Sequence, residues 1–217
     1  SAAERGGYAH FMLKEIFEQP KCLRDTISPR LKDGKVVLDS VDFTAEYLKK
    51  LRKIYFVACG SAYYVSLLAK YVIEKTCRIP TETLLASEFR YSHPVVDEND
   101  LVVIISQSGE TADSLAALRE AKRLGAKTMA IVNVVGSAIA KAADQVIYTW
   151  AGPEIAVATT KAYSTQMAVI DLLGLYFAHV LGTIADEEYR AILEEMLLLP
   201  GKMEEILERV DQIQYFA

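Results

Sequence analysis

The residues best suited to chemistry lie where an apolar run ends and a hydroxyl-rich turn begins. Residues 101–105 are all apolar, as expected of a strand that is buried on both faces. The next six residues, 106–111, read Ser-Gln-Ser-Gly-Glu-Thr and lead into a helical pattern. The first backbone N–H groups of a helix have no intrahelical partners and carry partial positive charge. The sequence therefore predicts an anion site, with Ser106, Ser108 and Thr111 as donors to phosphate oxygens.

An ordinary helix cap would explain some of the same residues. Ser and Thr are common N-cap residues, and a Ser-Gly pair is a common turn. Three hydroxyls and an amide within six residues favour a ligand site, and Gly109 lets the backbone approach the ligand closely. Neither a P-loop pattern nor the glycine pattern of dinucleotide-binding folds occurs in the chain. The turn therefore favours the phosphate of a small metabolite over a nucleotide.

Composition indicates a soluble globular protein and argues against several other classes. Of the 217 residues, 52% are hydrophobic and 24% are charged, and the formal net charge is -5. We expect no nucleic-acid partner, because Lys and Arg are not clustered. We expect no membrane partner, because no run of about 18 uncharged apolar residues occurs. The three cysteines lack metal or redox spacing, so we expect reduced thiols, a cytoplasmic location, no metal and no cofactor.

The elements that position the turn alternate between strand and helix. The predicted strands are residues 54–59, 83–85, 101–105, 128–132 and 146–149, and the predicted helices are 63–76, 87–91 with Ser87 as N-cap, 111–124, 137–143 and 161–181. This alternation predicts an α/β fold with a three-layer, doubly wound, five-stranded parallel sheet in the flavodoxin-like order 2-1-3-4-5. In that order the ligand crevice lies beyond strands one and three, where the turn at Gly60 and Ser61 would meet residues 106–111.

Helical extensions are expected on both sides of the sheet. We divide the chain into a helical lead-in segment (residues 1–50), a domain with the sheet (residues 51–182) and C-terminal helices (residues 183–217). We expect the first lead-in helix, residues 11–17, to stop before Pro20 and a second to follow at residues 21–27. The last two helices are expected at residues 187–199 and 202–213, on either side of Pro200.

The long connection after the fifth strand is a third candidate loop. Thr159 and Thr160 are expected to cap the helix that begins at Lys161, where the helix dipole disfavours a cation. A salt bridge to Glu154, a bound anion nearby or simple solvation would each account for the lysine.

Candidates for acid–base catalysis are weak. His10, His93 and His179 lie on a lead-in helix, beside a proline and inside an apolar helix, and none lies on a predicted crevice loop. Glu110 and Glu154 do lie on predicted loops, but neither has a partner at a spacing typical of paired acid–base work. The sequence therefore supports ligand binding better than catalysis, and we predict no catalytic residue in this chain.

Three segments together resemble a known enzyme family. They are residues 10–20 (HFMLKEIFEQP), 106–115 (SQSGETADSL) and 152–163 (GPEIAVATTKAY). They are similar to segments of the isomerising glutamine–fructose-6-phosphate aminotransferases, also called glucosamine-6-phosphate synthases, and specifically of the first of their two sugar isomerase (SIS) domains. The resemblance implies a homodimeric cytoplasmic enzyme that makes glucosamine 6-phosphate from fructose 6-phosphate and glutamine. It implies fructose 6-phosphate, glucosamine 6-phosphate or a related hexose phosphate as the ligand of this domain.

The resemblance also implies which residues contact the ligand. Matching positions place the sugar-phosphate contacts on Ser61, Ser106, Gln107, Ser108, Thr111, Val157 and Thr159. The family's glutaminase domain and its second SIS domain, which supplies the Glu, Lys and His of ring opening and isomerisation, are expected outside these residues. The isolated chain is therefore expected to be inactive. Two positions depart from the family pattern: Ser61-Ala62 replaces Thr-Ser, and Thr159 replaces Ser.

Two other functions stay open at this point. One is a self-sufficient aldose–ketose isomerase of the SIS type, working as a homo-oligomer with His93 or Glu110 supplied by a neighbouring copy. The other is a non-enzymatic sensor of a hexosamine phosphate. A sensor of this kind would normally carry a partner module, and neither a helix-turn-helix nor a basic segment is seen.

Overall fold

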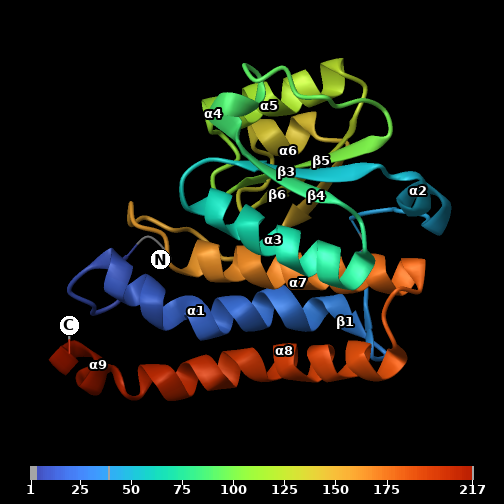
Figure 1. Cartoon of the computed structure of the whole chain (residues 1–217). Coiled ribbons are helices and arrows are strands. Elements are labelled where there is room, and N and C mark those ends of the chain that lie inside the picture. The colour runs from blue at the N-terminus through green and yellow to red at the C-terminus, as the bar shows by residue number, and fades with distance from the viewer. Residues whose placement is uncertain (1–3, 39, 217) are drawn as a thin grey trace.

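A five-stranded parallel sheet lies at the centre of the computed structural model, which describes residues 4–38 and 40–216 (Figure 1). The elements in chain order are α1 (Phe11–Ile27), a 3-10 turn (Ser28–Arg30), β1 (Leu31–Lys32), β2 (Lys35–Val36), α2 (Ala45–Lys50), β3 (Lys53–Ala58), α3 (Ser61–Cys77), β4 (Thr81–Leu85), α4 (Ala86–Phe89), β5 (Asp100–Ser106), α5 (Ala112–Arg123), β6 (Lys127–Val132), α6 (Ala138–Ala142), β7 (Gln145–Tyr148), α7 (Lys161–Leu181), α8 (Asp186–Leu207) and α9 (Val210–Phe216). The strand order is β4-β3-β5-β6-β7 and every neighbouring pair is parallel. The predicted doubly wound fold is confirmed.

Alternate side chains of the central strands enter two separate cores. In β5, Leu101, Val103 and Ile105 pack on the side of α3 and α7, while Val102 and Ile104 pack on the side of α4, α5 and α6. All five side chains are fully buried. Burial on both faces explains why this strand is a continuous apolar run rather than an alternating one.

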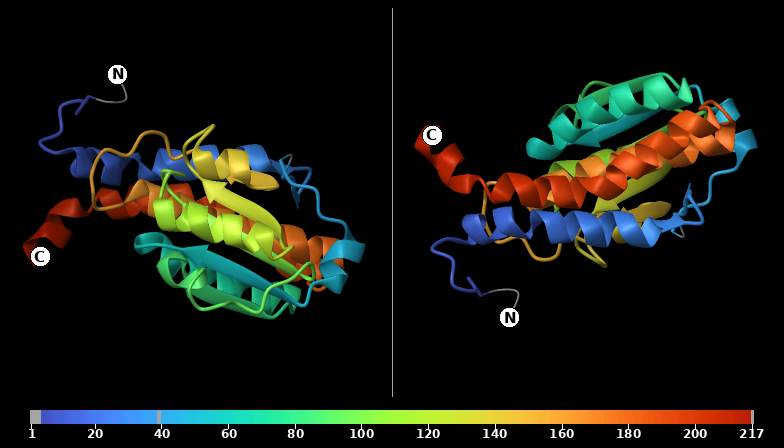
Figure 2. Two further views of the ribbon diagram at one scale, coloured as in Figure 1. Left: turned by 90° about the horizontal axis from the view of Figure 1, so that it is seen from above. Right: turned by 90° about the horizontal axis from the view of Figure 1, so that it is seen from below.

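Helices α1 and α8 form a further layer over α7 (Figures 1 and 2). Leu23 and Ile27 of α1 belong to the same apolar cluster as Leu193 and Met196 of α8 and one face of the sheet. The described parts of the lead-in segment and the C-terminal helices therefore share a core with the sheet.

Two prolines lie inside helices, where the sequence predicted breaks, and both predictions are wrong. Helix α1 continues through Pro20, which is buried. The carbonyl of Ile16, which loses the N–H of residue 20 as its partner, instead accepts a hydrogen bond from Gln19 Nε2 at 3.1 Å. Helix α8 likewise continues through the buried Pro200. An interior proline costs about 3 kcal/mol, and the burial of apolar side chains on these long helices offsets it.

Smaller differences from the prediction concern the short elements. The lead-in segment contains a β1–β2 hairpin whose two turn residues, Asp33 and Gly34, both have positive φ. Asp-Gly is a typical sequence for such a turn, so this signal was present and was missed. Ser87 lies within α4, and the N-cap residue of that helix is Leu85.

Helix α7 is a core helix of the fold. By length and composition it could cross a membrane, but 67% of its most apolar window is buried inside this protein. It packs against α3 and α1, which lie on opposite sides of it in Figure 1.

Candidate functional site

The two turns that the sequence predicted beside the ligand lie at the carboxyl ends of β3 and β5. These strands are direct neighbours, and Ala58 pairs with Ile105, so the turns that follow them leave the sheet side by side. The first turn passes through Gly60 into α3, which begins at Ser61. The second turn, residues 106–111, leads into α5 and is called the hydroxyl loop below. Two helix N-termini therefore meet at this edge, an arrangement that favours an anion.

The hydroxyl loop is held largely by its own side chains. The backbone N–H of Gly109 donates to Ser106 Oγ at 3.0 Å, and the N–H of Glu110 donates to Ser108 Oγ at 3.2 Å. The hydroxyl oxygens of Ser106 and Thr111 lie 3.3 Å apart. These hydroxyl contacts span five residues or fewer, and a longer one ties the loop to α6, where the N–H of Ile139 donates to the carbonyl of Gly109 at 3.0 Å.

Gly109 fits its position because it has no side chain. Its φ is +67°, and a Cβ at this position would lie 2.1 Å from Ser137 Oγ. The next residue links the loop to α6, since Glu110 Oε1 accepts a hydrogen bond from the N–H of Ala138 at 2.8 Å. The loop is thus packed tightly against the start of α6.

The hydroxyl groups of the loop do not cap α5. Thr111 is the N-cap residue of that helix, but its side chain makes no capping hydrogen bond. Ser106 is buried, Gln107, Ser108 and Thr111 are half-buried, and Ser61 at the start of α3 is exposed. A cap alone therefore does not explain the residue types of this loop.

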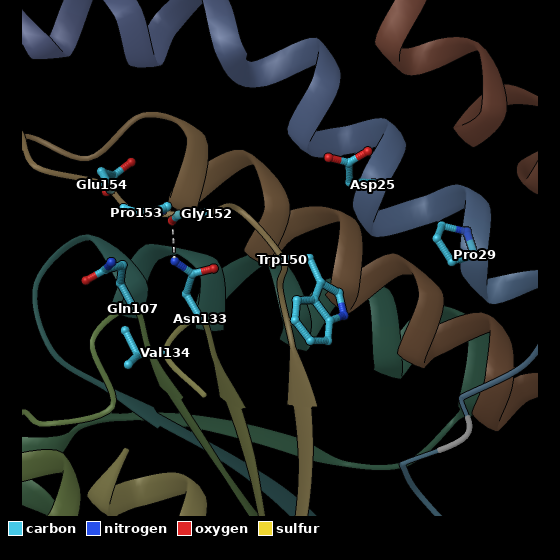
Figure 3. A pocket seen from close by; sticks show the side chains of 9 residues that line it. All are labelled: Asp25, Pro29, Gln107, Asn133, Val134, Trp150, Gly152, Pro153 and Glu154. Carbon is cyan, nitrogen blue, oxygen red and sulfur yellow. Dashed lines mark hydrogen bonds between the residues drawn. The ribbon is translucent and has the colours of Figure 1, made fainter. Parts of the chain in front are cut away.

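The third predicted loop lies in the connection between β7 and α7, residues 149–160, called the long connection below. Asn133, at the end of β6, ties this connection to the hydroxyl loop. Its N–H donates to the carbonyl of Gln107 at 3.1 Å, and its Nδ2 donates to the carbonyl of Gly152 at 2.7 Å (Figure 3). Its Oδ1 accepts from the N–H of Ala151 at 2.9 Å. The sequence reasoning missed Asn133, although a polar residue directly after a buried strand was a usable signal.

Val157 and Thr159 lie near the middle and the end of the long connection. The Val157 side chain is fully exposed and Thr159 is half-buried. Among the described residues, no hydrogen bond joins either side chain to the hydroxyl loop. The structure therefore brings Ser106, Ser108 and Thr111 together in one loop, while Val157 and Thr159 lie on a separate segment.

The start of α7 differs from the prediction in how it is capped. Thr160 is the N-cap residue, but its side chain makes no capping bond and its Oγ1 is buried without a hydrogen-bond partner among the described residues. Instead, Glu154 Oε2 accepts from the N–H groups of Thr160 at 3.1 Å and Ala162 at 3.0 Å. A carboxylate suits this place because the dipole is positive at a helix N-terminus.

Lys161 is neither solvated nor paired with Glu154, and those two predictions are wrong. It is 4% exposed, and its Nζ lies 2.7 Å from Glu18 Oε2 on α1. Glu18 is 143 residues away in sequence, so the pairing could not be read from spacing. The ion pair also offsets the unfavourable position of a cation in the first helical turn.

A cavity of about 1010 Å³ opens beside the hydroxyl loop, between α1 and the ends of β5, β6 and β7 (Figure 3). Of the predicted site residues, Gln107 is the one that lines it. The side chain of Trp150 is 50% exposed, and this residue has a φ of +56°, an unusual value for an aromatic residue. The lining residues are Asp25, Pro29, Gln107, Asn133, Val134, Trp150, Gly152, Pro153 and Glu154.

Glu110 and His179, two of the residues considered for acid–base work, make contacts within the protein. Glu110 is engaged with the backbone of Ala138, and the ring of His179 packs 5.3 Å from the ring of Tyr189. Within residues 4–38 and 40–216, no group of three or more His, Cys, Asp or Glu side chains could hold a metal ion.

Comparison with known proteins shows the family to which the chain belongs. The SIS domain family matches residues 47–176, more than half of the chain, and the protein belongs to this family. The glutamine–fructose-6-phosphate aminotransferase (isomerizing) of Clostridium acetobutylicum is 55% identical over 218 residues, which are 100% of this chain and 36% of that protein. The enzyme of the same name from Clostridium tetani is 56% identical over 208 residues, which are 95% of this chain and 34% of that protein.

A solved structure shows the same fold. The C-terminal domain of glucosamine-fructose-6-phosphate aminotransferase from Francisella tularensis superposes with a TM-score of 0.92 at 38% identity, over 99% of this chain and 60% of that chain. The resemblance predicted from the three sequence segments is confirmed. The chain spans about a third of the length of the curated relatives it matches.

Proposed function

We propose that this chain is the first SIS domain of an isomerising glutamine–fructose-6-phosphate aminotransferase and binds the phosphate of a hexose 6-phosphate. The observation that carries the proposal is the hydroxyl loop itself. The Thr111 hydroxyl makes no capping hydrogen bond to α5. The loop leads directly into the N-terminus of α5, and the N-terminus of α3 follows the neighbouring strand. The names of the related enzymes support fructose 6-phosphate as the ligand.

The chemistry of the site suits reversible binding of a phosphate dianion. Ser106, Gln107, Ser108 and Thr111 would donate hydrogen bonds to the phosphate oxygens together with backbone N–H groups at the start of α5. All of these donors are neutral, so binding relies on hydrogen bonds and helix dipoles rather than on a buried Lys or Arg. Ser61, Val157 and Thr159 would border the sugar.

We further propose that the groups for ring opening and isomerisation belong to parts of the enzyme outside these residues. The relatives are nearly three times as long as this chain, which leaves room for a glutaminase domain and a second SIS domain. On this proposal the natural enzyme is a cytoplasmic homodimer that makes glucosamine 6-phosphate, and residues 1–217 bind the sugar phosphate without converting it.

Titration of the purified chain with fructose 6-phosphate, followed by backbone amide NMR shifts, tests the proposal. We expect saturable shifts in residues 106–111, and a loss of affinity of roughly tenfold in Ser108→Ala and in Thr111→Val, equivalent to about 1.4 kcal/mol for each lost hydrogen bond. Ser87→Ala, in α4, is the matched control and should bind like the wild type.

Two results would contradict the proposal. One is the absence of saturable shifts in the wild-type chain. The other is isomerisation of fructose 6-phosphate by the contaminant-free chain, especially if His93→Ala or Glu110→Gln abolished it. That second result would favour the self-sufficient isomerase.

A further inference from the structure

Helix α1 holds the long connection along much of its length. Near the helix C-terminus, Thr26 Oγ1 donates to the carbonyl of Thr149 at 2.5 Å. One turn earlier, Cys22 Sγ donates to the carbonyl of Ala151 at 3.2 Å. Burial raises the pKa of the Cys22 thiol, which keeps it protonated and able to donate. The first residues of the connection are therefore bound to α1 by side chains of the helix.

Glu15 holds the part of the connection that precedes Val157. Its side chain is 2% exposed, and Oε1 accepts from the N–H groups of Ile155 at 2.6 Å and Ala156 at 3.3 Å. Its Oε2 is buried and has no hydrogen-bond partner among the described residues. A carboxylate that accepts from two consecutive backbone N–H groups makes strong, charge-assisted hydrogen bonds. Glu15 therefore determines where the segment leading to Val157 and Thr159 lies.

The far end of the connection is anchored by the next turn of α1. Glu18 pairs with Lys161, and Gln19 Oε1 accepts a hydrogen bond from Ser164 Oγ. Residues 155–159 therefore lie between two fixed points, the hydrogen bonds to Glu15 and the contacts of Glu18 and Gln19 with α7.

The hydroxyl loop does not depend on α1 in this way. Among the described residues, no hydrogen bond or ion pair joins α1 to residues 106–111. The two regions nevertheless border the same space, because Gln107 lines one cavity together with Gly152, Pro153 and Glu154. A change at Glu15 should therefore move one side of the site and leave the phosphate side in place.

We propose that Glu15 is a positioning residue for the sugar side of the site. It holds residues 155–159 so that the site prefers a phosphorylated hexose to inorganic phosphate. Because Glu15 is buried, it acts through the backbone it binds rather than by touching the ligand. The inference rests on the proposed function, which assigns Val157 and Thr159 to the sugar.

The test compares two ligands, fructose 6-phosphate and inorganic phosphate, by NMR titration of the wild type and of Glu15→Ala. We expect the affinity for fructose 6-phosphate to fall about tenfold, as for the loss of hydrogen bonds to a charged group, while the affinity for phosphate stays within about twofold. Glu15→Gln keeps an acceptor oxygen, although a weaker one, and should lose less of the preference than Glu15→Ala.

Thr26→Val is the matched control, because it removes another α1 bond to the same connection far from Val157. It should lower the melting temperature but leave the ratio of the two affinities unchanged. If Glu15→Ala weakens both ligands equally, or Thr26→Val changes the ratio as much, Glu15 has only a structural role and the inference is wrong. If the wild type binds neither ligand, the proposed function itself is wrong.

Amide exchange provides a second test that does not require Glu15→Ala to fold. The N–H groups of Ile155 and Ala156 should be protected in the wild type and should exchange about tenfold faster in Glu15→Gln, whose neutral amide is the weaker acceptor. Equal exchange rates in the two proteins would overturn the inference.

Discussion

The hydroxyl loop and the long connection border the same space but are built in opposite ways. The hydroxyl groups of the hydroxyl loop bond to residues at most five positions away, and the other hydrogen bonds of the loop run to Asn133, Ala138 and Ile139, at most 30 positions away. Those that α1 makes to the long connection join residues more than 120 positions apart, as for Thr26 with Thr149 and Glu15 with Ile155. The hydroxyl loop therefore takes its shape from its own sequence and from the neighbouring start of α6, whereas the long connection takes its shape from the packing of α1 on α7.

The two regions also differ in the kind of polar group they use. The hydroxyl loop presents mainly neutral donors, which suit a phosphate. The long connection is surrounded by the carboxylates of Glu15, Glu18 and Glu154, which would repel one. Each carboxylate is engaged, two by backbone N–H groups and Glu18 by Lys161. Glu15 and Glu154 therefore hold the backbone, and Glu18 balances the charge of Lys161.

The largest effect is expected where the hydroxyl loop is tightest. Gly109→Ala should lower the free energy of unfolding by about 3 kcal/mol, because a left-handed φ and a steric overlap with Ser137 add their costs. It should also abolish fructose 6-phosphate binding. Urea denaturation gives the stability, with Gly136→Ala as control, since that glycine also has a positive φ but has open space around it. Equal losses in the two variants would show that the contact with Ser137 is unimportant.

An intermediate effect, dependent on pH, is expected in the helix into which the long connection runs. Burial raises the pKa of Asp171 in α7 to about 6 from an ordinary value of 3.8. Between those values the folded state binds more protons than the unfolded state, so this group makes the protein less stable as the pH rises, with the full penalty above pH 6. Asp171→Asn removes the penalty and should stabilise the protein by about 2 kcal/mol at pH 8.

The stabilisation by Asp171→Asn should shrink as the pH falls towards 4, where Asp171 is protonated in the folded state. Urea denaturation of both proteins at pH 8 and pH 4 measures this. Asp211→Asn, on the exposed surface of α9, should show no such dependence. A stabilisation that is equal at the two pH values would contradict the assignment of the pKa shift to burial.

The smallest effect on stability is expected at the C-terminal end of the long connection, where Glu154 binds backbone N–H groups six and eight residues further along the chain. Glu154→Ala removes the acceptor for the N–H groups of Thr160 and Ala162 and should cost about 1 kcal/mol, as for the loss of a helix cap. Thermal unfolding measures it, and Glu154→Gln, which keeps an acceptor oxygen, should lose less. If Glu154→Ala melts like the wild type, the ion pair between Lys161 and Glu18 alone holds the start of α7.

The sequence was sufficient to predict the structure wherever the contacts that determine it join residues close together in the chain. The buried strand before Ser106, the turn at Gly109 and the helix after it follow from local patterns, and the strand order brings Ser61 beside them as expected. Helix breaks at Pro20 and Pro200 were predicted from local rules and were wrong, because buried apolar side chains hold both helices together.

Residues 106–111 therefore determine the residue types of the turn and the hydrogen bonds among its hydroxyls, since these act within one short stretch of chain. Only the tertiary structure decides the partner of Lys161, the role of Glu15 and the path of residues 149–160. Those contacts join the first helix to a segment more than a hundred residues later, and no local spacing encodes which side chains meet when two distant helices pack.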